Sequence, residues 1–387
     1  MPLLTGPVLR SLTIQEDDMT RSRLLLTTCI TLIFAFTATA FRTPGPRSAG
    51  SVTPAAPMLE PRSGHTATLL TDGRVLIAGG MRRNQDFYKS AELYDPATAK
   101  FLPTSEMNER RVSPIALLLK SGKVLIAGGW TGAGCTNSAE LYDPATGKFT
   151  SLTSKMTTRR GEARGTLLAN GDVLITGGAD HDSPGGIASA EIFRAATMTF
   201  EPLAPMHFAR ISHTSTLLPD GRVLIVGGRG DKVNAAVEIY DPTTARFTET
   251  GSLITARYKH TAGLLADGRV LIAGGSDERD WSGNLNSAEI YDPEKGKFTA
   301  VSPMNDSRFK LPEEAVQLSS GKLLIAGGSK DVEVFDPATG KFLVASGQIN
   351  DARHFMTETR LKDGSVLLAG GYPNNDQATA QAWIYRP

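Results

Sequence analysis

The chain has 387 residues, of which 40% are hydrophobic and 21% charged, a composition typical of a globular protein with a large buried core. Its 41 lysines and arginines stand against 40 aspartates and glutamates, so no whole-molecule field of either sign attracts nucleic acid or an anionic membrane. The 39 glycines and 22 prolines have no collagen-like period, which indicates many short elements joined by tight turns.

The first 40 residues have the pattern of a targeting segment. Arg21 and Arg23 precede a mostly apolar run at 24–36, and small residues ending at Ala40 provide a signal-peptidase site. We expect a signal peptide over residues 1–40, with cleavage after Ala40. The protein is then expected to be secreted or periplasmic. The alternative is that the apolar run stays uncleaved as an N-terminal membrane anchor.

Three further expectations follow for this end of the chain. Met19 stands just before the basic residues, so we expect translation to start there. Residues 41–50 are expected to form a short tether. Cleavage would remove Cys29 and leave Cys135 as the one cysteine, so no intramolecular disulfide can form and stability must come from packing.

From residue 58 onward the sequence repeats itself, and the clearest mark is a Gly-Gly pair that closes a short apolar run. Seven such pairs occur, at Gly79-Gly80, Gly128-Gly129, Gly177-Gly178, Gly227-Gly228, Gly274-Gly275, Gly327-Gly328 and Gly370-Gly371. Successive pairs are 49, 49, 50, 47, 53 and 43 residues apart. A period of about 50 residues is typical of propeller repeats, in which each copy forms one small sheet.

Each copy has the pattern of four short strands. In the first copy an apolar run at 65–70 leads through the turn Asp72-Gly73 into a second strand at 74–80, and strands at 90–96 and from Lys100 follow. Asp-Gly provides the positive φ that a tight hairpin needs. The second strands are apolar on both faces, which suits sheets packed between neighbouring sheets.

These features resemble the kelch family of β-propellers. In that family, as here, the third strand carries Tyr-Asp-Pro and the fourth begins with an aromatic residue. The third-strand aromatics are Tyr94, Tyr142, Tyr240, Tyr291 and Phe335, and the fourth-strand aromatics are Phe101, Phe149, Phe200, Phe247, Phe298 and Phe342. The third copy departs from the motif with Phe193-Arg194-Ala195, and phenylalanine replaces the tryptophan of most kelch blades. The resemblance covers residues 51–387 and implies an all-β, seven-bladed kelch-type propeller.

The two ends of the repeat region complement each other. The seventh copy stops after its third strand, at Tyr385-Arg386-Pro387, so that blade lacks an outer strand. The segment 51–57 matches the fourth strand of the third copy, which starts at Thr199. We therefore expect the N-terminal strand 51–57 to complete the last blade and remove its exposed edge.

One end of the predicted ring carries the variable sequence. In a four-stranded antiparallel blade, the loops between second and third strands share an end with the links between blades, and we call this end the loop face. Variable loops on a rigid scaffold are a usual place for binding sites. The tryptophans and the tyrosine predicted in these loops could stack on sugars or anchor a protein partner. The candidates are Trp130, Trp281 and Tyr372.

An arginine also recurs at the start of every copy. The seven are Arg62, Arg111, Arg160, Arg210, Arg257, Arg308 and Arg353. One interpretation is a cationic funnel near the channel that binds carboxylate, sulfate or phosphate groups, because guanidinium groups suit such anions. The kelch resemblance also implies that arginines at this point of the repeat line the partner-binding mouth.

The alternative is a structural role for these arginines. A glutamate precedes the third-strand aromatic in six copies and could hold the arginine in an ion pair between blades: Glu92, Glu140, Glu191, Glu238, Glu289 and Glu333. Trp383 replaces this glutamate in the seventh copy, so we expect Arg353 to be the freest arginine.

Three histidines follow the arginines by three residues, but they occur in only some copies. His65, His213 and His260 are too scattered around the ring to share a metal, so we expect no metal site and no cofactor. The tripeptide Arg229-Gly230-Asp231 matches an integrin-type motif, which loops of this composition also produce by chance.

The sequence favours an exported binding protein, and whether it has enzyme activity stays open, with no catalytic residue assigned. We expect a protein or glycan ligand that can carry anionic groups, no nucleic acid partner, no membrane contact after signal cleavage, and a monomer. The kelch resemblance leaves two enzymes as alternatives, a sialic-acid mutarotase type and a galactose oxidase type. The second type needs copper ligands, for which this chain offers Cys135, Tyr258 and His260.

Overall fold

The computed structural model describes residues 49–387 with the exception of 84–85, 181–184 and 374–376. The predicted signal peptide at 1–40, with its cleavage site and the alternative anchor, lies outside the described residues, as does most of the tether at 41–50. Within the described part, no helix is long and apolar enough to cross a membrane.

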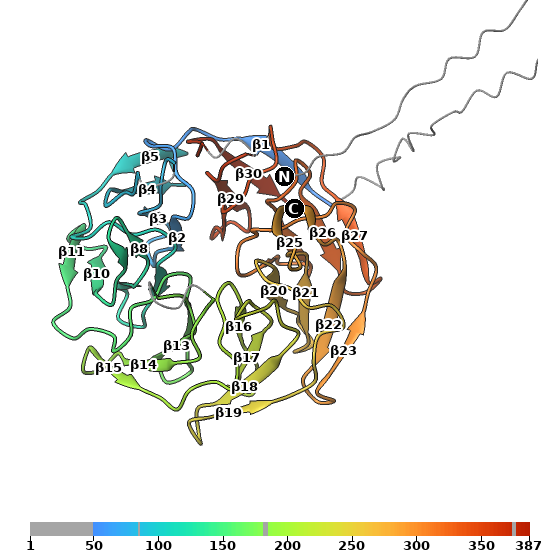
Figure 1. The fold of residues 1–387 in the computed structure, drawn as a ribbon. Helices are drawn as coiled ribbons and strands as arrows, with labels where there is room; N and C mark the ends of the chain where they lie inside the picture. Colours follow the sequence, from blue (N-terminus) through green and yellow to red (C-terminus); the bar gives the residue numbers. More distant parts are fainter. Residues whose placement is uncertain (1–48, 84–85, 181–184, 374–376) are drawn as a thin grey trace, which may run out of the picture. The chain divides into compact units, whose positions relative to one another are not determined.

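The described residues of 49–387 form a ring of seven four-stranded antiparallel sheets (Figure 1). Blades 1 to 3 consist of β2 (Thr66–Leu69), β3 (Val75–Ala78), β4 (Ala91–Asp95) and β5 (Lys100–Pro103); β6 (Ile115–Leu118), β7 (Val124–Ala127), β10 (Ala139–Asp143) and β11 (Lys148–Ser151); and β12 (Arg164–Leu167), β13 (Val173–Thr176), β14 (Ala190–Arg194) and β15 (Thr199–Pro202). Blades 4 and 5 consist of β16 (Thr214–Leu217), β17 (Val223–Val226), β18 (Val237–Asp241) and β19 (Arg246–Glu249); and β20 (Thr261–Leu264), β21 (Val270–Ala273), β22 (Ala288–Asp292) and β23 (Lys297–Ala300). Blades 6 and 7 consist of β24 (Val316–Gln317), β25 (Leu323–Ile325), β26 (Glu333–Asp336) and β27 (Lys341–Val344); and β28 (Thr357–Arg360), β29 (Val366–Ala369), β30 (Ala382–Arg386) and β1 (Ser51–Pro54).

Two small elements lie in the loops. The strands β8 (Trp130–Thr131) and β9 (Gly134–Cys135) form a hairpin in blade 2, and a single 3-10 turn, η1 (Asp280–Ser282), lies in blade 5. The seven first strands, β2, β6, β12, β16, β20, β24 and β28, each contact the next one and together line the axis of the ring. The sequence prediction of a seven-bladed all-β propeller is therefore confirmed.

The hydrophobic core lies between the blades. The second strands are buried along their whole length because each blade is covered on both sides by a neighbour. Val75 and Ile77 of blade 1 pack, for example, against Leu367 and Ala369 of blade 7. Seven clusters of this kind fill the spaces between the blades, which explains why the repeated runs are apolar on both faces.

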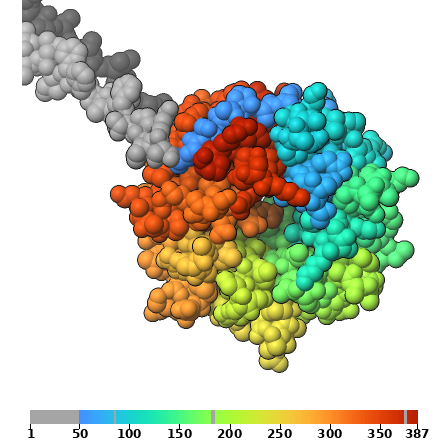
Figure 2. All heavy atoms as spheres, turned by 180° about the vertical axis from the view of Figure 1, so that it is seen from behind, coloured from blue at the N-terminus to red at the C-terminus, as the bar shows by residue number. Residues whose placement is uncertain are grey.

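The N-terminal strand completes the last blade, as predicted. Strand β1 pairs with β30, so that Val52 lies opposite Tyr385, and the pairing extends over Ser51–Pro54 (Figure 1). Figure 2 shows the same closure from behind, where the blue N-terminal segment lies beside the red C-terminal blade. Strand β1 thus pairs with the backbone groups on the edge of β30 that would otherwise lack partners.

Candidate functional site at the channel mouth

The arginine that opens each copy links two neighbouring blades through a backbone hydrogen bond. Its carbonyl oxygen accepts a hydrogen bond from the second glycine of the preceding blade, with N–O distances between 2.7 and 2.9 Å in all seven places. A side chain on the first glycine of the pair would also collide with this carbonyl, since a Cβ atom at Gly79 would lie 2.4 Å from the oxygen of Arg111. The Gly-Gly pairs of the repeat therefore allow the backbones of neighbouring blades to approach closely.

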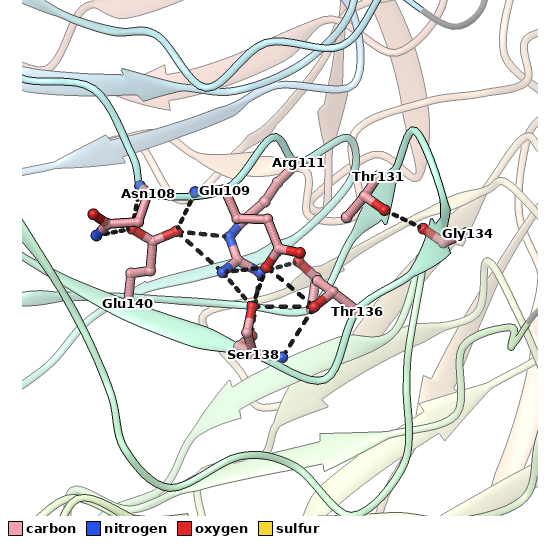
Figure 3. A network of polar contacts seen from close by, with 9 residues as sticks. Asn108, Glu109, Arg111, Thr131, Gly134, Thr136, Ser138 and Glu140 are labelled. Atoms are coloured by element: carbon pink, nitrogen blue, oxygen red, sulfur yellow. Dashed lines mark hydrogen bonds and ion pairs between the residues drawn. The ribbon is translucent and has the colours of Figure 1, made fainter.

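The guanidinium groups of the first six arginines point into their own blades. Figure 3 shows the second copy, where Arg111 donates to Ser138 and to Glu140. The same guanidinium group also donates to the carbonyl oxygen of Gly128. The side chains of Arg111 and Glu140 are 0% and 1% exposed. The glutamates thus pair within a blade and not between blades, in contrast to the alternative predicted above.

We call the arginines that open the seven copies the ring arginines. The others have the same arrangement as Arg111, with one exception. Arg62, Arg160, Arg210, Arg257 and Arg308 pair with Glu92, Glu191, Glu238, Glu289 and Glu333. Arg353 packs instead over the ring of Trp383 at 5.8 Å and bonds to Gln381, and its buried Nε has no partner. This arginine lacks the buried carboxylate of the others, but it is still only 4% exposed. The ligand-binding role predicted for the seven arginines stays a prediction, and their burial gives them a structural role.

The loop-face end of the channel is bordered by a different set of seven residues, each two positions after a ring arginine. All seven have a left-handed backbone, with φ between 48° and 59°. We call them the rim: Gly64, Ser113, Glu162, Ser212, Lys259, Lys310 and Phe355. A residue with a side chain adopts this conformation at a cost of roughly 1 kcal/mol or more.

Hydrogen bonds between rim residues explain why the conformation is kept. The backbone nitrogen of Ser113 donates to the carbonyl of Gly64 at 2.7 Å, and that of Gly64 to Phe355 at 3.1 Å. Phe355 donates in turn to Lys310 at 2.9 Å. At these joints the left-handed turn gives adjacent blades a backbone bond at the mouth, and the bond does not depend on the rim side chains.

Inside the rim lies a cavity of about 280 Å³, which we call the cup. Its wall is made by rim residues and by the beginnings of the first strands. The charged residues that line it are Glu162, Arg164, Lys259, Glu313, Glu314 and Glu358. Arg164 and Glu358 depart from the repeat, because the matching places in the first copy carry Thr66 and Ala67.

An ion pair spans the cup between blades 3 and 6. Arg164 at the start of β12 contacts Glu313, although 149 positions separate the two residues. Glu313 reaches the cup because Leu318 follows Arg308 by ten positions, whereas the matching leucine follows the arginine by eight positions in every other copy. The extra residues pair with Ala262 of β20 and shorten β24 to two residues.

The shortened strand leaves a backbone donor that a carboxylate satisfies. The nitrogen of Ala326 donates to Oε1 of Glu358 at 2.7 Å, while Oε2 of Glu358 is buried and without a partner. Burial raises the pKa of Glu358 to about 8. Partial desolvation by the walls of the cup, together with the nearby Glu162 and Glu314, also raises the pKa of Glu313, against the lowering effect of Arg164.

A second cavity of about 440 Å³ adjoins the cup, and we call it the side hollow. Met81, Phe87 and Val112 line it together with the β8–β9 hairpin, from which Trp130 contributes its ring. Four residues belong to both cavities: Gly64, Ser113, Glu162 and Phe355. The side hollow therefore joins an aromatic surface to the charged cup.

The three predicted aromatic residues do not form one site. Trp130 lies in the side hollow, with its indole against the backbone of Gly161. Trp281, 45% exposed, covers the ammonium group of Lys310 at 3.6 Å, and the buried Tyr372 accepts a hydrogen bond from the same ammonium group. These last two residues belong to a cation–aromatic cluster around Lys310, which also includes Phe355.

The three recurring histidines bind neighbouring blades. His65, His213 and His260 each bond through Nε2 to a threonine of the preceding blade: Thr357, Thr176 and Thr214. Burial lowers the pKa of His65 to about 3, and lowers the pKa of the other two well below the usual value. Arg229 of the integrin-type tripeptide is held in bridges to Ile211 and Val233.

Comparison with known proteins supports the fold. A Kelch motif matches at residues 116–156 and 257–305. No curated protein sequence matches the chain. A solved structure similar to this chain is a fungal alcohol oxidase of the AA5 family in complex with copper, at 17% identity and a TM-score of 0.71. The match covers 88% of this chain and 77% of that one.

The copper of that oxidase raises the question of whether this chain could hold the metal. Cys135 lies in the β9 strand of blade 2, whereas Tyr258 and His260 belong to blade 5. The hydroxyl of Tyr258 donates to Asp280, and His260 bonds to Thr214. The described residues contain no group of three or more His, Cys, Asp or Glu side chains placed to hold a metal ion. These residues do not fit the copper site proposed from the sequence.

Proposed function

We propose, from the premise that this chain is a seven-bladed β-propeller of the kelch-repeat family, that it is a binding protein whose ligand enters the channel mouth on the loop face. The kelch propeller fold favours an interaction role, because a rigid ring presents many loops at one end. The observation that carries the proposal is the side hollow, an aromatic surface that opens into a charged cup.

A glycan is the ligand that these two cavities favour, and a protein partner is the alternative. Faces of aromatic rings such as Trp130 and Phe87 stack on the apolar faces of sugars. Carboxylate and hydroxyl groups such as Glu162 and Ser113, which border the same space, suit the hydroxyl groups of a sugar. Ligand sites of this size commonly combine an apolar wall with a few placed polar groups.

The test is a glycan array probed with the purified protein and with Trp130→Ala. We expect selective glycan binding by the wild-type protein and a loss of at least about tenfold in the variant, because the stacking surface is removed. Leu102→Ala is the matched control, since Leu102 is 42% exposed on the outer strand β5, away from the cup and the side hollow. An unchanged affinity in Trp130→Ala would overturn the role of the side hollow.

A second variant tests the same surface through Gly161, which lies against the indole of Trp130. Gly161→Ala would place a methyl group about where the indole now lies, since a Cβ atom there would be 2.5 Å from Nε1 of Trp130. We expect this change to displace the ring and weaken glycan binding. Binding of a protein, with no glycan bound in either form, would favour the alternative partner.

The proposal also includes export of the protein and a monomeric state. The signal pattern before Ala40 supports a periplasmic or secreted location. Fractionation of cells that express the full chain, with N-terminal sequencing of the product, tests both export and the cleavage site. Retention in the membrane fraction would favour the anchor instead.

The enzyme alternatives need a catalytic residue that the cup would have to supply. Glu358 and Glu313 are titratable groups there, but no feature of the cup specifies a reaction. Turnover of a bound sugar, or copper uptake with alcohol oxidation, would replace the binding role by a carbohydrate-active one. Copper uptake is checked by titration of the purified protein with Cu²⁺ and by metal analysis.

A further inference from the structure

The cup contains one arginine among the described residues that line it, and this arginine is not part of the repeat. Arg164 occupies the first position of β12, where the matching residues of other copies are Thr66, Ile115, Thr214, Thr261 and Thr357. Its side chain is 10% exposed. Because the symmetric positions already hold the ring together, a charged residue found in a single copy calls for a separate explanation.

The bonds of Arg164 are incomplete in comparison with those of the ring arginines. Nε donates to the carbonyl of His213 at 2.5 Å, and Nη1 donates to the carbonyl of Ala163 at 3.3 Å and to Glu313. Within the described residues, Nη2 has no hydrogen-bond partner. By contrast, all three nitrogens of Arg111 are bonded to oxygens of its own blade. The guanidinium of Arg164 therefore keeps a free donor at the cup.

Glu313 holds Arg164 loosely. It uses one oxygen, comes from the inserted segment of blade 6, and its side chain is 53% exposed. Glu162 and Glu314 lie close enough to Glu313 to disfavour its charge. A single-contact ion pair with one exposed partner contributes little to stability. A planar carboxylate that meets both Nη atoms makes a stronger pair.

We propose that Arg164 binds the carboxylate group of a ligand and that Glu313 occupies this place in the unliganded protein. The ligand carboxylate takes the free Nη2 and replaces Glu313 on Nη1. Glu313 can leave because it is exposed and because its inserted segment is held by backbone bonds to Ala262, which do not involve the carboxylate. The cup would then select an acidic ligand over a neutral one of the same shape.

This inference rests on the proposed function for the rest of the ligand, which we infer to be a sugar acid. The side hollow supplies the stacking surface and shares Glu162 and Ser113 with the cup. A sugar acid combines a ring for that surface with a carboxylate for Arg164. Glucuronate and glucose are matched probes, because they differ at the carboxylate, and acetate is a probe for the carboxylate alone.

The experiment measures the affinity of each probe by calorimetry for four proteins. We expect the wild-type protein to prefer glucuronate over glucose, and Arg164→Gln to lose about tenfold or more of its affinity for glucuronate. Glu313→Gln removes the competing carboxylate and should raise the affinity for glucuronate roughly two- to fivefold. Glu106→Gln is the matched control, because Glu106 is exposed and lines neither the cup nor the side hollow, and should change the affinity less than twofold.

The outcomes separate this inference from the proposed function. Equal glucuronate affinity in the wild-type protein and in a folded Arg164→Gln would overturn the carboxylate site while leaving glycan binding intact. Should Arg164→Gln not fold, Glu313→Gln decides, since an unchanged or weaker affinity there contradicts the competition. If no sugar binds but acetate raises the melting temperature of Glu313→Gln and not of Arg164→Gln, the carboxylate site stands and the glycan proposal fails.

Discussion

The backbone nitrogen of Gly371 donates a hydrogen bond to the carbonyl oxygen of Arg62 at 2.8 Å, which joins the last blade to the first. The same bond joins every other pair of neighbouring blades, so the ring has seven equivalent joints. Each joint uses the arginine backbone toward one blade and, in the first six copies, its buried side chain toward the other. The arginines can therefore be tested as parts of the scaffold.

Removal of a fully bonded ring arginine should destabilise the protein strongly. Arg111→Met leaves the buried Glu140 without its cation, which we expect to cost about 3–5 kcal/mol in the free energy of unfolding. Arg353→Met should cost at most about 1–2 kcal/mol, because no buried carboxylate is left behind and Nε already lacks a partner. Urea denaturation of both variants measures the difference, and equal losses would contradict it.

Closure of the ring should depend on the inward face of β1. Val52 is 5% exposed and packs in the core of blades 6 and 7, so Val52→Asp should cost about 3 kcal/mol or more. Thr53 points outward on the same strand, and Thr53→Asp is the matched control with an expected change below about 0.5 kcal/mol. Thermal unfolding gives both values. Size-exclusion chromatography of Val52→Asp should also reveal oligomers if β1 detaches and exposes the edge of β30.

The left-handed rim predicts a stabilising substitution. Ser113 has φ of 48° and its side chain makes no hydrogen bond among the described contacts. Ser113→Gly should relieve the backbone strain and raise stability by about 0.5–1 kcal/mol. The reverse change, Gly64→Ala, should lower stability, because a Cβ atom there would lie 2.9 Å from Val112. Both shifts are readable as changes in the midpoint of urea denaturation, and a destabilised Ser113→Gly would refute the strain.

Glu358 should give the protein a distinctive pH dependence. Burial raises the pKa of this carboxyl group to about 8, whereas in the unfolded chain its pKa is near the ordinary glutamate value of 4.5. Between these two values the folded state holds a proton that the unfolded state has released, so stability falls as the pH rises and levels off above about pH 8. The total loss is on the order of a few kcal/mol.

Glu358→Gln should remove this loss, because the amide is neutral throughout and its oxygen can still accept from Ala326. We expect the variant to gain stability over the wild-type protein from pH 5 to pH 8, measured by denaturant unfolding at several pH values. Glu106→Gln, at an exposed side chain, is the control and should show no such trend. A constant difference between wild type and Glu358→Gln across this range would refute the raised pKa.

The scaffold could be predicted from local sequence. The Gly-Gly pairs, the hairpin turns that end in glycine and the doubly apolar strands recur seven times, and each encodes its own short element through backbone chemistry. The match between 51–57 and a fourth strand predicted that the N-terminal strand completes the last blade, and β1 does pair with β30. Repetition also drew attention to the arginines, although the sequence did not reveal that their side chains turn into the blades.

The residues of the cup could not be found in this way. Arg164 and Glu313 are departures from the repeat, visible in the sequence as an extra charge and a two-residue insertion, but they lie 149 positions apart. Repeat periodicity determined which residues form each blade, since strands and turns depend on near neighbours in the chain. Only the closed ring decided which departures meet, because opposite blades face each other across an axis that no local pattern encodes.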